Sequence, residues 1–430
     1  MAASVWVYVQ RVLIPYQVAD AAAHGRPRGV LSDLYPRWVG TRELLFHGKD
    51  PYSSEVTRQI QTGYYGRPLD PSRPDDPRDE QRFAYPVYVV FYLAPIAKLP
   101  FSTVRQISAW ALAILTGISV LLWLRAIYWR ISRSGIAIWL LLVLSSVAAV
   151  QGIKLQQLSL AVAALLAGCA ALLVEQHLVL AGILLALATV KPQVALLPAL
   201  WLLLWTFSNW RERQNFFWGF LAGMAALFAA SEYILPGWLP RFVGAVIAYR
   251  HYAGGSLSEL FGPTAATAIA LGALLALAAV CWRVRLAPAD SPPFMLALAL
   301  ALAVTVILFS ILAPYNQVLL LPTVLLIMRQ HREFWEKHRL RRVAFTVAAI
   351  FVLWPWAASM VLAPASFLVP AQSIQKAWAV PLWSSIGVPI LILPLLSMLL
   401  VSSLRDERSA LIGLNSGPGV RVRDTRRGSS

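Results

Sequence analysis

Residues 158–207 read LSLAVAALLAGCAALLV-EQH-LVLAGILLALATV-KPQ-VALLPALWLLLWTF, three apolar runs separated by two short polar breaks. A helix that crosses a bilayer needs roughly 20 mostly apolar residues, with every backbone group hydrogen-bonded inside the helix. Similar runs recur from Gly135 to Ser403. The composition agrees, because 58% of the 430 residues are hydrophobic, 13% are charged and the mean hydropathy is +0.63. The sequence therefore predicts an all-α integral membrane protein.

The apolar runs predict about twelve transmembrane helices. We place them near residues 2–19, 106–124, 135–151, 158–174, 178–190, 194–207, 216–235, 263–282, 294–312, 318–328, 343–362 and 384–402. The first has neither a basic start nor a clear cleavage site, so we interpret it as a spanning helix and not as a signal peptide. Cys169 and Cys281 lie in apolar runs and are expected to be buried, inert thiols.

The net charge of +17 is segregated by loop. Nineteen Lys or Arg residues fall in loops 125–134, 208–215, 283–293 and 329–342 and in the tail 403–430, against five in the short loops opposite. The positive-inside rule then predicts a cell-membrane protein with both termini in the cytoplasm. These basic residues orient the protein and contact anionic lipid headgroups, so we expect no nucleic-acid partner. Residues 1–402 form the transmembrane domain, and 403–430 a basic cytoplasmic tail that we expect to be disordered.

Two pairs of runs are ambiguous. The runs at 178–190 and 318–328 are short, and each could merge with a neighbour into one long helix kinked at Pro192 or Pro322. Merging either pair alone would place the basic loop 329–342 outside. The charge bias therefore favours two short helices in each case, and the breaks between them are expected to line a cavity.

The one large hydrophilic segment, residues 20–85, is the first extracytoplasmic loop in this topology. It holds ten acidic and ten basic residues. Residues 34–47 mix apolar and charged side chains and predict an interfacial helix that ends at Gly48. Residues 67–82, rich in proline and charge, predict a flexible insert. The apolar piece 83–95 is too short to span, so a re-entrant or interfacial segment is expected.

Several short motifs recur in a recognisable order. They are Ser32-Asp33-Leu34-Tyr35, Gly48-Lys49-Asp50-Pro51-Tyr52, Phe83-Ala84-Tyr85-Pro86, Gln156-Gln157-Leu158-Ser159-Leu160, Lys191-Pro192-Gln193 and Pro314-Tyr315-Asn316-Gln317. In this order they resemble glycosyltransferase family 87, mannosyltransferase-like enzymes of the GT-C superfamily. The resemblance implies a GT-C type bundle that transfers a hexose, mannose in this family, from a polyprenyl-phosphate sugar to an extracytoplasmic glycolipid or glycan. It also implies inversion at the anomeric carbon without a metal or other cofactor.

Asp33 is the candidate general base, because the resemblance places an aspartate at the start of the first loop in that role. A carboxylate suits the task, since the acceptor hydroxyl must lose a proton as it attacks the anomeric carbon. The alternative is that Ser32 and Asp33 cap the helix that follows. Asp50 is the competing acid, and its Asp-Pro-Tyr context favours a structural turn.

Three cations are candidates for the donor phosphate. Lys191 lies between two apolar helices, where an ammonium is unfavourable unless it meets an anion, although it could also snorkel to the interface. Arg37 could bind phosphate or, with Arg42, form a solvated helix face. Arg250 belongs to the loop 236–260, which could close over a substrate or form an interfacial belt.

Polar residues at the outer ends of helices are candidates for binding sugar hydroxyls or for joining helices. These candidates are Tyr35, Gln156, Gln157, Gln193, Tyr315, Asn316 and Gln317. The histidines show no metal-ligand spacing, and His331, Glu333, Glu336 and His338 fit a charged cytoplasmic face. Two other functions stay open: a transporter or flippase for a lipid-linked or small polar substrate, and a lipid-linked oligosaccharide ligase. The chain shows no repeat between its halves, which disfavours a transporter.

Overall fold

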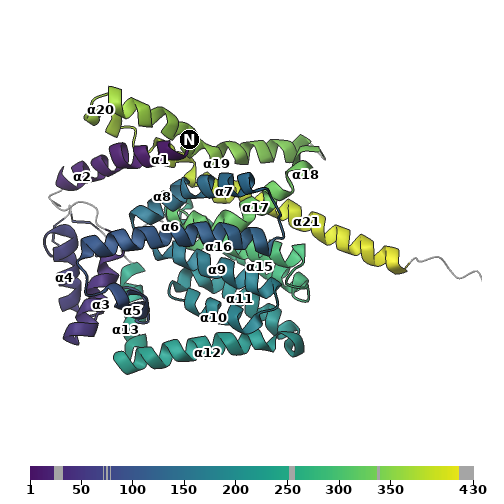
Figure 1. Ribbon diagram of the computed structural model, residues 1–430, viewed down its shortest axis with the longest axis horizontal. Helices are drawn as coiled ribbons and strands as arrows, with labels where there is room; N and C mark the ends of the chain where they lie inside the picture. Colours follow the sequence, from purple (N-terminus) through teal and green to yellow (C-terminus); the bar gives the residue numbers. More distant parts are fainter. Residues whose placement is uncertain are drawn as a thin grey trace, which may run out of the picture.

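The computed structural model describes the chain except residues 24–31, 71, 74–75, 78, 251–256, 337–338 and 416–430. Its described residues form helices and turns, with no strand among them. Figure 1 shows the long helices running across the molecule, with α3, α4 and α13 at one end and α18 and the end of α21 at the other. The all-α class expected from the sequence is thus confirmed.

The N-terminal part of the chain supplies the first helix and the first loop. Its helices are α1 (Ala2–Tyr8), α2 (Ile14–Ala23), α3 (Tyr35–His47), α4 (Ser54–Tyr65) and α5 (Val89–Leu93). A π-helical turn, Val9–Leu13, joins α1 to α2, so the first helix continues beyond residue 19. Helix α3 ends as expected at Gly48, whose left-handed φ of 64° lets its N–H bond the carbonyl of Leu44.

The remaining helices form the body of the molecule. They are α6 (Phe101–Ala126), α7 (Arg133–Leu144), α8 (Val147–Lys154), α9 (Leu158–Val174), α10 (Leu178–Ala188), α11 (Pro192–Ser208), α12 (Trp210–Ile234), α13 (Trp238–Arg250), α14 (Leu257–Phe261), α15 (Pro263–Val284), α16 (Pro292–Ser310), α17 (Leu321–Arg329), α18 (His331–Glu336), α19 (Arg339–Leu368), α20 (Ala371–Gln375) and α21 (Gly387–Asn415). Helix α21 continues past the expected domain boundary at residue 402, because few helix breakers interrupt 403–415. Residues 416–430 of the expected tail lie outside the described residues.

Six helical stretches of the described chain are long and apolar enough to cross a membrane, or seven if α7 and α8, bent by 56°, count as one. Helices α9, α10, α11 and α13 are apolar but shorter. A multi-pass membrane protein is therefore supported, while the count of twelve spans stays a prediction. Helix α16 is apolar on all sides and its residues are almost all buried, so it forms the centre of the bundle.

Both ambiguous pairs are two separate helices. Helix α10 ends at Ala188 and α11 begins at Pro192, whose missing N–H suits a first helical position. Helix α16 is followed by a 3₁₀ turn, Pro314–Leu320, before α17. The breaks predicted from the charge bias are confirmed, and they carry the Lys-Pro and Pro-Tyr motifs.

Two glycines allow close packing of α10 against α12. A Cβ atom on Gly182 would lie 2.2 Å from the carbonyl oxygen of Phe216, and one on Gly219 would lie 2.2 Å from that of Val179. Small residues at a membrane helix interface let the two backbones approach in this way. The contact fixes α10, and with it the turn that carries Lys191.

Candidate functional site

The start of the first loop is held against the turn that follows α8. The backbone N–H of Asp33 donates to the carbonyl of Leu155 at 3.0 Å, and the Ser32 hydroxyl donates to the same carbonyl at 3.1 Å. Ser32 also accepts from the N–H of Leu34 at 3.0 Å. The Asp33 carboxylate instead accepts from the side-chain amide of Gln157. The alternative in which Asp33 caps the next helix is therefore wrong, because its carboxylate points toward α9.

Lys191 is the centre of a buried polar network. Its ammonium group donates to Gln157 Oε1 at 3.1 Å, to Asn316 Oδ1 at 3.4 Å and to the Ser159 hydroxyl, and Ser159 donates to Asn316. The Tyr315 ring centroid lies 5.2 Å from the same nitrogen. Lys191 is only 4% exposed. A lysine has three N–H donors, so the network uses all of them and Lys191 does not snorkel.

Gln157 links this network to Asp33. Its Oε1 accepts from Lys191, and its amide nitrogen donates to Asp33 Oδ2. The ammonium therefore fixes which end of the amide faces the carboxylate, since only the oxygen can accept from a lysine. Residues from the first loop, α9 and the turns before α11 and α17 thus meet at one point.

Arg37 lies on the other side of Asp33. One of its N–H groups donates to the Asp33 backbone carbonyl, and its guanidinium carbon lies 4.3 Å from the centre of the Tyr85 ring. Arg37 is half-buried, so the alternative of a solvated face is wrong for it. Arg42 packs on Trp38 at 4.8 Å instead. Arg37 lies in the first turn of α3, four residues after Asp33, and this spacing explains its bond to the Asp33 carbonyl.

Asp79 is a second carboxylate at the site, which the sequence analysis did not single out. It interacts electrostatically with Arg37 and Asp33, and the Tyr249 hydroxyl from α13 donates to it. It also accepts from the backbone and side-chain N–H groups of Gln81, at 3.0 and 2.7 Å. Asp79 lies in the charged insert 67–82, in which Leu69, Asp79 and Glu80 form hydrogen bonds with side chains of α4. For example, Tyr65 donates to the Asp79 carbonyl at 2.6 Å.

The charged groups of the site shift one another's pKa values. Burial raises the pKa of Asp33 above its usual value; Arg37 opposes this rise, while Asp79 adds to it. Burial also raises the pKa of Asp79, against the lowering effects of the Gln81 N–H and Arg37. Lys191 lies in the turn between α10 and α11, outside both helices. Burial, with a further contribution from Arg37, lowers its pKa to about 7. A carboxylate and an ammonium with pKa values shifted toward neutrality are typical of a functional site.

Other predicted residues have structural contacts. Gln156 donates to the carbonyls of Ile153 and Lys154, and Gln317 donates to the carbonyl of Ser385. Tyr35 packs among Trp38, Tyr64 and Phe101. Gln193 is exposed in the first turn of α11. The Arg250 side chain lies outside the described residues. Among the described side chains, Gln156, Gln193 and Gln317 form no hydrogen bond with Asp33, unlike Gln157.

Asp50 has the structural role expected for it. Its carboxylate accepts from the N–H of Tyr52 at 2.9 Å, which forms the turn, and pairs with Arg241 at 3.1 Å. The pairing attaches α13 to the first loop, in addition to the contact between Tyr249 and Asp79. Loop 236–260 could close over a substrate or form an interfacial belt, and its described part lies against the first loop through Arg241 and Tyr249.

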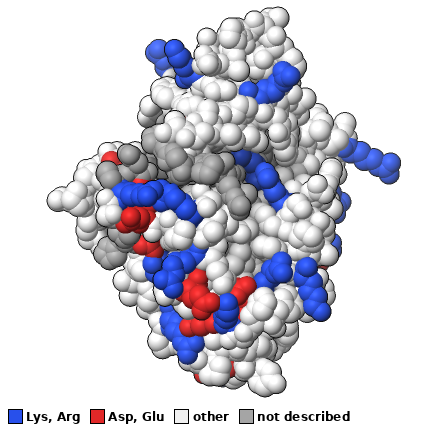
Figure 2. All heavy atoms as spheres, turned by 90° about the vertical axis from the view of Figure 1, so that its left-hand side faces the viewer, with Lys and Arg blue, Asp and Glu red and all other residues white. Residues whose placement is uncertain are grey.

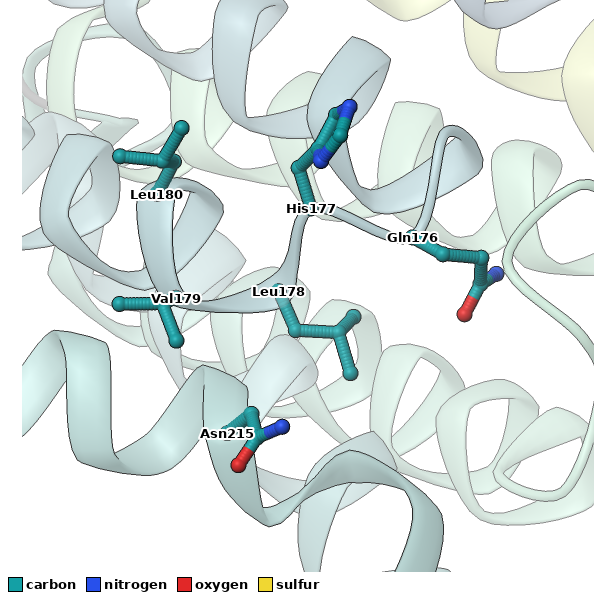
Figure 3. A pocket seen from close by; sticks show the side chains of 6 residues that line it. All are labelled: Gln176, His177, Leu178, Val179, Leu180 and Asn215. Atoms are coloured by element: carbon teal, nitrogen blue, oxygen red, sulfur yellow. The ribbon is translucent and has the colours of Figure 1, made fainter.

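The described chain also has two cavities outside this network. One, of about 230 Å³, lies at the turn between α9 and α10 and is lined by His177 and Asn215 among others (Figure 3). It is at the far end of α9 from Gln157, about 25 Å away at 1.5 Å per residue. The other, of about 500 Å³, lies in the first loop. No group of three or more His, Cys, Asp or Glu residues suited to a metal occurs among the described residues.

The sequence model of glycosyltransferase family 87 matches residues 83–310, slightly more than half of the chain. The chain belongs to this family. It is therefore a membrane glycosyltransferase. No curated protein and no solved structure matches it. The matched region contains Gln157, Ser159 and Lys191, while Asp33 and Asn316 lie outside it and are joined to it by the hydrogen bonds described above.

The end of the glycosyltransferase that carries Asp33 is rich in charge of both signs. Figure 2 views the end at which α3, α4 and α13 lie in Figure 1, and it shows acidic and basic side chains mingled over the face. Uncharged residues cover most of the remaining surface in this view. A polar end of this kind suits contact with water and hydroxylated substrates, in contrast to the apolar sides of α12 and α15.

Proposed function

We propose that this glycosyltransferase moves a hexose from a polyprenyl phosphate carrier to a hydroxyl group of an extracytoplasmic glycolipid or glycan. The hexose that we propose is mannose. The observation that carries the proposal is the half-buried Asp33, whose carboxylate is held by Gln157 between two cations. A base that is fixed beside positive charge matches the needs of sugar transfer from a phosphate ester.

The chemistry assigns one role to Asp33. The acceptor oxygen attacks the anomeric carbon, the bond between that carbon and the phosphate oxygen breaks, and polyprenyl phosphate leaves with the electron pair. Asp33 takes the hydroxyl proton as the new bond forms. A single carboxylate is enough, because phosphate leaves as an anion, unlike the leaving oxygen in glycoside hydrolysis, which an acid must protonate. Attack opposite to the leaving phosphate inverts the anomeric centre.

Arg37 and Lys191 supply the positive charge that stabilises the leaving phosphate. Arg37 uses one N–H on the Asp33 carbonyl and keeps further donors in a planar fork that suits phosphate. Lys191 has its three donors engaged, so it acts through its charge and by orienting Gln157, and it binds phosphate directly only by exchanging one bond. We assign the binding of sugar hydroxyls to Tyr315 and Asn316, which both contact Lys191.

The location follows from the charge distribution. The basic loop 329–342 contains α18, which lies at the end of the molecule opposite α3 and α4 (Figure 1). If basic loops face the cytoplasm, Asp33 faces the extracytoplasmic side of the cell membrane, and both termini are cytoplasmic. The lipid carrier then approaches from the outer leaflet.

A transfer assay tests the proposal. The purified chain in liposomes is given radiolabelled polyprenyl-phosphate mannose and a glycolipid acceptor, with a nucleotide mannose as the control donor. We expect label to enter the acceptor from the lipid donor only. Transfer from the nucleotide sugar, or movement of the labelled lipid across the bilayer without any transfer, would contradict the proposal.

A further inference from the structure

The cavity in the first loop is separate from the Lys191 network and has a lining suited to sugars. It measures about 500 Å³, within the range of small-molecule sites. Among the residues that the structure describes, three carboxylates and three guanidinium groups line it, together with hydroxyls, an amide and the aliphatic residues Leu69 and Pro77. The charges of the described lining residues balance, so these residues give an anion no net attraction.

The paired charges leave donors and acceptors free. Glu80 pairs with Arg82, and Asp76 pairs with Arg67, which lies outside the lining. A carboxylate has about four lone-pair positions and a guanidinium five N–H donors, so one pairing saturates neither. The guanidinium of Arg58, on α4, forms no hydrogen bond or ion pair with any residue that the structure describes. A sugar hydroxyl is both donor and acceptor, and alternating groups of both kinds complement it.

One short segment separates this cavity from Asp33. Glu80 and Arg82 line the cavity, while Asp79 and Tyr85 interact with Arg37 on the other side of the segment. Tyr52 also lines the cavity, and its hydroxyl donates to the Tyr85 carbonyl at 2.7 Å. Contacts through Tyr85 and Arg37 therefore connect the lining of the cavity to the segment that carries Asp33.

We propose that the cavity formed by Tyr52, Arg58, Asp76, Glu80 and Arg82 binds the distal sugars of a neutral oligosaccharide acceptor. The inference rests on the proposed function, in which Asp33 acts on one end of the acceptor. The acceptor is then a chain of several neutral sugars instead of a single sugar. The cavity thus selects acceptors by length, while Asp33 acts on the terminal hydroxyl.

Direct binding tests the cavity without any transfer reaction. A neutral mannotriose is titrated by saturation-transfer NMR into the purified full chain, in the absence of a lipid donor. Arg58→Ala and Glu80→Gln are expected to raise the Kd at least tenfold. Arg58 is exposed on α4, so its removal leaves the fold intact. Asn215→Ala, in the cavity of Figure 3, is the matched control and is expected to leave the Kd unchanged.

Three results would overturn the inference: no saturable binding by the wild type, a Kd in both cavity variants equal to that of the wild type, or tighter binding of a phosphorylated than of a neutral trisaccharide. Because no donor is present, these outcomes are independent of whether the chain uses polyprenyl-phosphate mannose. In the transfer assay the same variants should raise the acceptor KM about tenfold for a trisaccharide acceptor, with the donor KM unchanged.

Discussion

Replacing Lys191 with methionine removes the charge at the centre of the site with little change in side-chain volume. The structure allows the effect on stability to be worked out. Asn316 Oδ1 still accepts from Ser159, so only Gln157 Oε1 loses its partner among the described residues. A buried acceptor left unpaired costs about 1–3 kcal/mol, and the loss of a buried charge offsets part of this. We therefore expect Lys191→Met to fold, with a modest loss of thermal stability.

The effect on catalysis is expected to be larger. Without Lys191 the Gln157 amide is free to turn, so its donor to Asp33 is no longer fixed, and the leaving phosphate loses a positive charge. Removing one preorganised group that stabilises developing charge lowers kcat by roughly 100-fold to 1000-fold in well-studied cases. We expect a fall of about 100-fold in kcat.

Initial rates of sugar transfer, measured in liposomes with matched amounts of folded protein, check this prediction. Lys376→Met is the control, because Lys376 is an exposed lysine outside the network. A Lys191→Met variant that keeps at least half of the wild-type kcat would refute the role given to the network.

Three further predictions concern other parts of the chain. The rate should fall in acid at a higher pH than an ordinary aspartate predicts, because Asp33 has a raised pKa, and in base above about 7, where Lys191 loses its proton; a flat profile from about pH 4 to about pH 9 would count against both roles. Arg37→Gln should raise the donor KM at least about tenfold, since charged hydrogen bonds contribute about 1.5–3 kcal/mol; an unchanged donor KM would exclude phosphate binding by Arg37. Gly182→Ala should lower the Tm, whereas Gly244→Ala, with nothing within 4 Å of its Cβ position, should not.

Much of the helical architecture was predictable from local signals. The break at Pro192 follows from the missing N–H and fixed φ of proline, and the end of α3 follows from the positive φ that Gly48 can adopt. Helix α4 was missed, although Ser53 accepts from the N–H of Val56 and Gly66 ends the helix, which are ordinary start and stop signals. Helix α4 is largely polar, so no apolar run marks it in the sequence.

The site was predictable only in part, because its contacts join distant segments. Asp33 and Gln157 are 124 positions apart, and Lys191 and Asn316 are 125 apart, so no local pattern shows that they meet. The motifs pointed to these residues individually. Ser159 was part of a motif but was not singled out as a site residue, and Asp79 was one of many charges in the insert 67–82. Their roles depend on neighbours that only the folded chain supplies.

The central claim is that Asp33 takes the acceptor proton, and single-turnover transfer by Asp33→Asn tests it most directly. Asparagine keeps the shape of the side chain and can still accept from Gln157, but it cannot act as a base at neutral pH. The account predicts donor binding close to that of the wild type and a fall of at least about 100-fold in the transfer step, within the range for general base catalysis. Asp50→Asn, which preserves the turn at Tyr52, should transfer normally. Transfer by Asp33→Asn at the wild-type rate would contradict the account.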